Sequence, residues 1–234
     1  MQRSSWMSLI LGLITHGDGI VASDGRLFGP AVLELGKVVK PALVESDEFD
    51  KTFSLGKGRL IGAYAGLMKF AGKNVAMHIE EIFEASARGE TEFSRIIAKL
   101  VEGIESKLSK IDEQEVVFGC RKVDVLVIGR KSPRKRQLEI ARLRFAPSDG
   151  TISHIVNIDS AGKVIRHCLF GDDDAQAAAN RLLMSNRAPM RNAAFLENLA
   201  MRAMNAGIEY SGPQRYGSER ACGEAIFIQT IRAK

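Results

Sequence analysis

The chain has few cysteines and no long apolar run, and both absences limit what it can be. Its 234 residues contain three cysteines, Cys120, Cys168 and Cys222, without metal-ligand spacing. No apolar run approaches the ~20 residues that span a bilayer. The first seven residues, MQRSSWM, are too short and too polar for a secretory signal. We therefore expect a cytoplasmic chain with reduced thiols and no membrane partner.

Nucleotide-binding and metal-binding patterns are also missing from the sequence. Neither GxGxxG nor GxxxxGK[ST] occurs, and GKGRLIGAYAG has the glycines without the spacing. The four histidines are scattered and form no ligand set, and His78 is expected to be an ordinary packed side chain on a helix face. We predict no cofactor and no metal site.

The composition is that of a globular protein with a basic excess. Apolar residues make up 45% and charged residues 26%, and the net charge is +5. Much of the excess lies in GRKSPRKRQ, residues 129–137, which could bind nucleic acid. No aromatic side chains interleave the basic ones, so a solvated hairpin turning at Ser132 and Pro133 is the favoured interpretation.

Strand patterns open the chain. Ser8–Thr15 and Ile20–Arg26 flank a turn expected at His16–Gly19, because Asp-Gly is a strong hairpin signal. A long excursion follows, with a short strand expected around Val38 and Val39. Strands are next expected at 51–55 and 60–65.

Helical and strand patterns then alternate in blocks. Phe70 to Phe83 form an apolar helix face ending at Gly89, and a second helix over 93–108 is expected to have Thr91 as its N-cap. Further strands are expected at 123–130, 137–145, 151–159 and 163–171, the second with a change of apolar phase near Ala141. Helices spanning 175–183 and 196–208 and a closing strand at 224–231 complete the order. Paired helices after strand blocks predict an α+β fold, with two stacked sheets and a helical layer on each outer face.

Several segments, in this order, resemble one family. They are Ser8 with Gly12, the Asp18-Gly19 pair, ASDGR ending at Arg26, KTFSL opening at Lys51, and Ala65-Gly66, followed by AMRAMNAGIE and ERACGEAIFI near the end. Together they resemble the proteasome β-subunit group of N-terminal nucleophile (Ntn) hydrolases over almost the whole chain. The resemblance implies a four-layer αββα sandwich of two antiparallel sheets between two helical layers. Residues 8–234 would be a single domain, and residues 1–7 would be a propeptide or a mis-assigned start.

The resemblance also implies roles for individual residues. Ser8 would supply both the nucleophilic hydroxyl and, as a free α-amine, its own base, since an α-amine titrates near ~7.7–8.0. Lys51 would stabilise negative charge beside it and Asp24 would hold Lys51, with Lys40 as a rival lysine. Gly66 would offer its N–H to the oxyanion. The remaining site residues implied are Glu219, which supports the amine, Asp172 and Cys222, which replace two serines of the family, and Arg26, which lines the site.

The implied function is amide-bond cleavage of peptides or unfolded proteins through an acyl-enzyme on Ser8. The family assembles into rings, so a homo-oligomer is expected, and any unfolding ATPase would be a separate chain. The alternative is a catalytically inactive structural subunit that retains residues 1–7. A nucleic-acid-associated protein using residues 130–136 is a third, weaker hypothesis.

Overall fold

Two antiparallel sheets form the centre of the structure, a computed structural model. It describes residues 8–28, 32–34, 37–40, 43–111, 122–148, 151–162, 164–186, 193–212 and 220–233. The first sheet has the strand order β14 (Arg166–Gly171), β1 (Leu9–Ile14), β2 (Asp18–Asp24) and β15 (Ile226–Arg232). The second has the order β13 (Thr151–Ser160), β12 (Lys135–Ser148), β11 (Val123–Ser132), β8 (Leu60–Gly66) and β7 (Thr52–Leu55).

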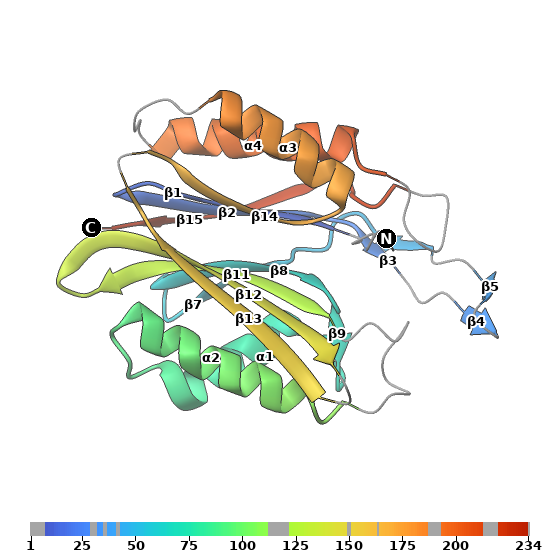
Figure 1. Cartoon of the computed structure of the whole chain (residues 1–234), viewed down its shortest axis with the longest axis horizontal. Coiled ribbons are helices and arrows are strands. Elements are labelled where there is room, and N and C mark those ends of the chain that lie inside the picture. Colours follow the sequence, from blue (N-terminus) through green and yellow to red (C-terminus); the bar gives the residue numbers. More distant parts are fainter. Residues whose placement is uncertain are drawn as a thin grey trace.

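Helices cover the outer face of each sheet, so the prediction of a mixed α+β chain is confirmed (Figure 1). Helices α3 (Asp173–Ser185) and α4 (Ala193–Glu209) lie along the first sheet. Helix α1 (Val75–Ile82), its π-helical continuation η1 (Phe83–Ala87) and α2 (Phe93–Leu108) lie along the second. None of the described helices is long and apolar enough to cross a membrane.

Three apolar clusters fill the spaces between these elements. One lies between the sheets and includes Ile10, Val21 and Leu126; the other two lie beneath the two helical pairs. The predicted phase change in β12 is confirmed: Leu138 and Ile140 face the other sheet, whereas Leu143 faces α1 and α2. Strand β11 is buried on both faces, as its continuous apolar run predicted.

The first hairpin is tighter than predicted. Asp18 and Gly19 belong to strand β2 instead of the turn, and the second strand ends at Asp24, two residues before the expected end at Arg26. Thr15 closes the turn, because its backbone N–H donates to the Asp18 carbonyl at 2.8 Å and its hydroxyl accepts the Asp18 N–H at 3.1 Å. The turn is therefore closed by hydrogen bonds between Thr15 and Asp18, and not by the Asp-Gly turn that the sequence predicted.

The first helical pair also begins differently. Phe70 was placed on the first helix face but lies in the short strand β9 (Lys69–Phe70), which pairs with β10 (Lys73–Asn74). The Asn74 side chain caps α1 by accepting the Met77 N–H at 2.8 Å. The predicted cap of α2 by Thr91 is wrong: Glu92 holds that position without a side-chain hydrogen bond. His78 is a packed side chain, as predicted, stacked on the Phe70 ring at 3.8 Å.

Short strands interrupt the excursion between Arg26 and Lys51. The expected strand around Val38 and Val39 is confirmed as β5. The strands of this region are β3 (Leu27–Phe28), β4 (Val32–Glu34), β5 (Lys37–Lys40) and β6 (Val44–Ser46). Strand β6 pairs with β3, which brings residues 43–50 back towards the end of β2.

Tyr64 provides a test of the core beneath α1 and α2. Its side chain is fully buried and its hydroxyl has no hydrogen-bond partner among the described residues. Burial raises the pKa of this phenol far above its usual value, so the group stays neutral. Because an unpaired buried hydroxyl is costly, we expect Tyr64→Phe to raise the free energy of unfolding by roughly 1 kcal/mol in urea titrations. A destabilised variant would show that the hydroxyl has a partner.

Candidate active site

A buried carboxylate, that of Asp24, organises the candidate site. It lies at the end of β2 with no exposed surface. Its Oδ1 accepts hydrogen bonds from the Leu9 N–H at 2.7 Å and the Lys51 ammonium at 3.1 Å. Its Oδ2 accepts the N–H groups of Arg26 at 3.0 Å and Gly223 at 3.1 Å. Four donors from four separate segments therefore compensate the burial of this charge.

Lys51 is the second charged group of the site and is also fully buried. It precedes β7, and its carbonyl accepts the Tyr64 N–H at 3.1 Å, which fixes the start of β7 against β8. The side chain crosses from the second sheet to Asp24 in the first. This ion pair thus links the two sheets, and it brings Asp24 to Lys51 as the resemblance implied.

Ser8 is held at the start of β1 through both polar groups of the peptide unit that joins it to Leu9. Its carbonyl accepts the Asp172 N–H at 2.9 Å, and the next N–H, that of Leu9, donates to Asp24. Gly171 allows this approach, because a Cβ there would lie 1.8 Å from the Ser8 carbonyl oxygen and its φ is +132°. Leu9 and Lys51 donate to the same carboxylate oxygen, so the ammonium lies close to the backbone that carries the Ser8 hydroxyl.

Asp172 has a structural role that sequence reasoning missed. It is the N-cap of α3: its Oδ1 accepts the Ala175 N–H at 2.9 Å and the Gly212 N–H at 3.2 Å. Asp is among the preferred N-cap residues, and three residues separate it from the N–H that it caps, so the DDDA sequence carried this signal. The side chain is 4% exposed and lies at the junction that holds Ser8.

Cys222 lies beside the ion pair and is 1% exposed. Burial is the main cause that raises the pKa of its thiol well above the usual value, and the Asp24 carboxylate adds to the effect, although Lys51 opposes it. A hydrogen bond with Ser211 engages the side chain. The thiol therefore stays protonated near neutral pH and is no nucleophile, since the thiolate is the reactive form.

Gly66 and Arg26 are two further residues that the resemblance assigned to the site, and the structure places them differently. Gly66 ends β8, is half-buried and has φ of +94°, a conformation that strains other residues. Arg26 contributes its backbone N–H to Asp24, whereas its guanidinium turns to Asp47, with Nε 2.5 Å from Oδ1. The Arg26 side chain thus anchors residues 43–50 through Asp47, instead of lining the space at Ser8. Glu219 and residues 1–7 lie outside the described residues.

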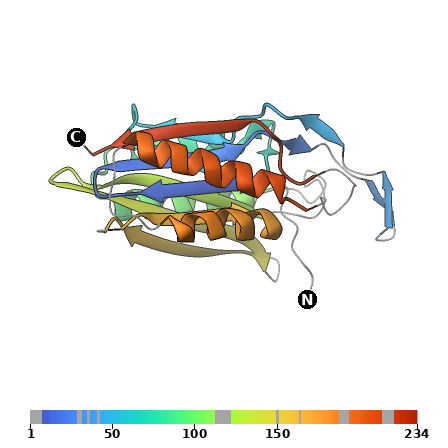
Figure 2. The same cartoon turned by 90° about the horizontal axis from the view of Figure 1, so that it is seen from above.

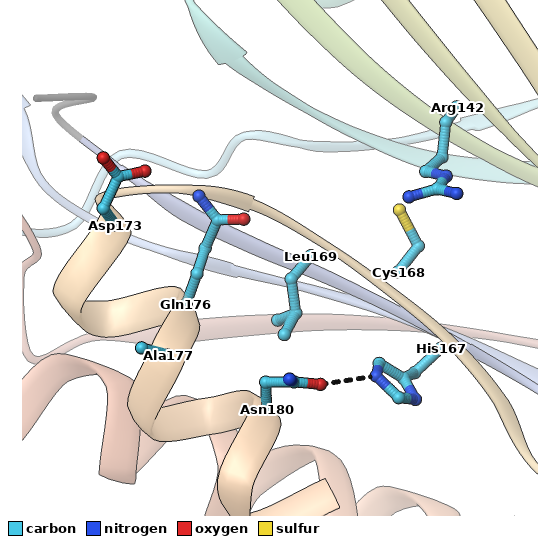
Figure 3. A pocket seen from close by; sticks show the side chains of 8 residues that line it. All are labelled: Arg142, His167, Cys168, Leu169, Asp173, Gln176, Ala177 and Asn180. Carbon is cyan, nitrogen blue, oxygen red and sulfur yellow. Dashed lines mark hydrogen bonds between the residues drawn. The ribbon is translucent and has the colours of Figure 1, made fainter. Parts of the chain in front are cut away.

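A hollow of about 390 Å³ lies between β14 and α3, and Ser8 is not among its lining residues (Figure 3). Its lining includes Leu169, Gln176 and Ala177, and the His167 ring is hydrogen-bonded to Asn180 at 2.9 Å. Figure 3 shows the Arg142 guanidinium directed at the Cys168 thiol. Among the described residues no group of three or more His, Cys, Asp or Glu side chains could hold a metal ion.

Comparison with known proteins adds no assignment to this geometry. No protein-family model matches the chain, and no curated protein matches it.

The ion pair between Asp24 and Lys51 can be tested by removing either partner. We expect Lys51→Met and Asp24→Asn each to lower the free energy of unfolding by about 3–5 kcal/mol, because each leaves a buried group without its counterpart. The double variant should lose clearly less than the sum of the two losses. Additive losses in urea titrations would show that the pair is not coupled.

The two described thiols should resist alkylation in the native protein. Burial raises the pKa of Cys168 to about 12, and that of Cys222 also lies well above the usual value. In a Cys120→Ser background at pH 8, we expect iodoacetamide to label both cysteines more than about a thousand-fold more slowly than in the unfolded chain. Rapid labelling of Cys222, read by mass spectrometry, would contradict the burial of this site.

Proposed function

We propose that this chain is an Ntn-hydrolase of the proteasome β-subunit type, with the four-layer αββα sandwich of that class. It would cleave amide bonds in peptides or unfolded proteins through an acyl-enzyme on Ser8. The observation that carries the proposal is the shared acceptor at Asp24: the N–H that follows Ser8 and the buried Lys51 ammonium donate to one oxygen. A serine, a lysine and an aspartate from three separated segments thus meet at one end of the sheets.

The chemistry requires that residues 1–7 be removed, so that Ser8 carries a free α-amine. The amine then takes the proton from the Ser8 hydroxyl while Oγ attacks the carbonyl carbon of the substrate. The amine passes this proton to the departing nitrogen as the C–N bond breaks, which leaves an ester on Ser8. Water, deprotonated by the same amine, cleaves the ester and restores the hydroxyl.

Lys51 and Gly66 would stabilise the charge that develops in these steps. The Lys51 ammonium, kept in place by Asp24, favours a neutral amine and the negatively charged intermediate. The Gly66 N–H would donate to the oxyanion, and the absence of a side chain lets a substrate approach the end of β8. Glu219 would support the amine, as in the family that the sequence resembles.

The setting of this activity follows from the same proposal. The chain would act in the cytoplasm as a homo-oligomeric ring, with a separate ATPase as the partner that delivers unfolded substrates. It would need no metal or cofactor for the steps above, because hydroxyl, amine, ammonium and backbone N–H supply all the groups.

A second candidate is a structural subunit that retains residues 1–7 and does not cleave. It is favoured by the burial of Ser8, which has no exposed surface in the chain that carries residues 1–7. An acylated Ser8 nitrogen cannot accept a proton, so this chain would keep the fold without the base. The two candidates differ in the state of the N-terminus.

The intact mass of the purified protein separates the two candidates. We expect loss of residues 1–7, followed by stoichiometric labelling with a serine-reactive peptide warhead. Ser8→Ala should abolish labelling, whereas the matched control Ser54→Ala, on the exposed side of β7, should label like the wild type. A full-length chain that takes no label would establish the structural subunit instead.

A further inference from the structure

Strand β13 presents an unprotected sheet edge. It is the outermost strand of its sheet, pairs with β12 over ten residues without a bulge, and has no other partner among the described strands. Residues 153–159 are exposed, and Ile155, Val156 and Ile158 show 59%, 38% and 38% of their surface. Proteins usually protect such edges with lysine, proline, bulges or short strands. Strand β13 has none of these four devices, and its one acidic side chain, Asp159, lies next to its last residue.

The other sheet edges are better protected. Strand β7 has only four residues and β14 six, and the first four residues of β15 are half-buried. Strands β7 and β15 also pack against each other on the side opposite β13 and β14. The exposed apolar edge is therefore confined to one side of the molecule.

Two arginines of β12 lie on the same face of the second sheet as Ile155, the face that points towards the first sheet. Ile155 is the register partner of Arg144, and Arg142 lies two residues further along the same face of β12. The Arg144 guanidinium lies 5.2 Å from the Phe170 ring centre. Arg166 lies on the same face of β14 as Cys168 and Phe170, the face that points towards the second sheet. Its side chain is exposed.

Two acidic side chains form ion pairs with two of these three arginines. Asp124 is bound to Arg144 at 2.8 Å, and Asp159 lies 3.9 Å from Arg142. The group formed by Ile155, Arg142, Arg144 and Arg166, hereafter the basic edge, therefore keeps a positive charge next to an exposed apolar side chain.

An acidic segment, residues 43–50, lies on the opposite side of the molecule. Leu43 is 58% exposed, and its exposed acids are Glu45, Asp47, Glu48 and Asp50. The segment is anchored to the end of β2 by the Phe49 N–H, which donates to the Gly25 carbonyl at 2.8 Å. In Figure 2 the light-blue strands of this region lie beside β15, across the molecule from the ochre strands β13 and β14.

We infer that the acidic segment of a second copy of this chain docks against the basic edge of the first. The two surfaces are complementary in charge, and each offers an exposed aliphatic side chain, Leu43 or Ile155, for the centre of the contact. They lie on opposite sides of one chain, so the contact is heterologous: each copy uses one surface for each neighbour. Repetition of such a contact produces a ring when the rotation closes. The inference thus gives the proposed ring its contact surface, and in that respect it rests on the proposed function.

The test compares two variants with a control that reverses two charges elsewhere on the surface. The acidic variant is Glu45→Lys/Glu48→Lys, and the edge variant is Ile155→Asp/Arg166→Glu. The control is Arg134→Glu/Lys135→Glu, at two exposed positions where the turn enters β12. We expect wild type and control to sediment as oligomers at low ionic strength. Each of the two variants should raise the dissociation constant at least about ten-fold. Added salt should weaken the wild-type contact.

Mixing the two variants identifies the kind of contact. An equimolar mixture should form a one-to-one dimer, because the intact acidic segment of the edge variant can still dock on the intact basic edge of the acidic variant. The inference is overturned if wild type is monomeric, or if the acidic variant assembles normally. It is also overturned if mixing gives no dimer. The same series in a Ser8→Ala background separates this outcome from catalysis, since assembly does not require the nucleophile.

Discussion

Four segments of the chain depend on one buried negative charge, that of Asp24. Its two oxygens accept donors from β1, from Lys51 before β7, from Arg26 after β2, and from Gly223 before β15. A buried carboxylate without such donors would be expensive, so the arrangement holds only when all four segments are in place. The carboxylate therefore makes the closure of this end of the sheets cooperative.

The same interaction also positions the groups that the proposed mechanism uses. Lys51 can be buried because Asp24 neutralises it, and Ser8 is fixed because the next N–H donates to that carboxylate. Structural and chemical requirements thus coincide at one oxygen. A buried ion pair alone is no evidence for chemistry; what favours the proposal here is that the pair adjoins a serine whose following peptide unit is held at both its N–H and its carbonyl.

Periodicity explains what the sequence could predict. Strand and helix patterns gave the order of elements, and the shift of apolar residues near Ala141 correctly placed the two faces of β12. Local side-chain chemistry was harder: Thr15 overrode the Asp-Gly turn, and Glu92 replaced Thr91 at the start of α2. Backbone donors such as Gly223 could not be predicted, because 199 residues separate it from Asp24 and nothing in its own neighbourhood signals the contact.

Asp172 stands where the resembled family has a serine, and the fold alters the effect expected of its charge. From the sequence, an extra carboxylate near the Ser8 amine would be expected to hold the amine in its charged form and weaken it as a base. In the structure one oxygen of that carboxylate is engaged by two N–H groups, at the N-terminus of α3, where the helix dipole also offsets negative charge. The charge that the amine would experience is therefore smaller than that of an unpaired carboxylate. Because the Asp172 N–H also binds the Ser8 carbonyl, the residue positions Ser8 as it caps the helix.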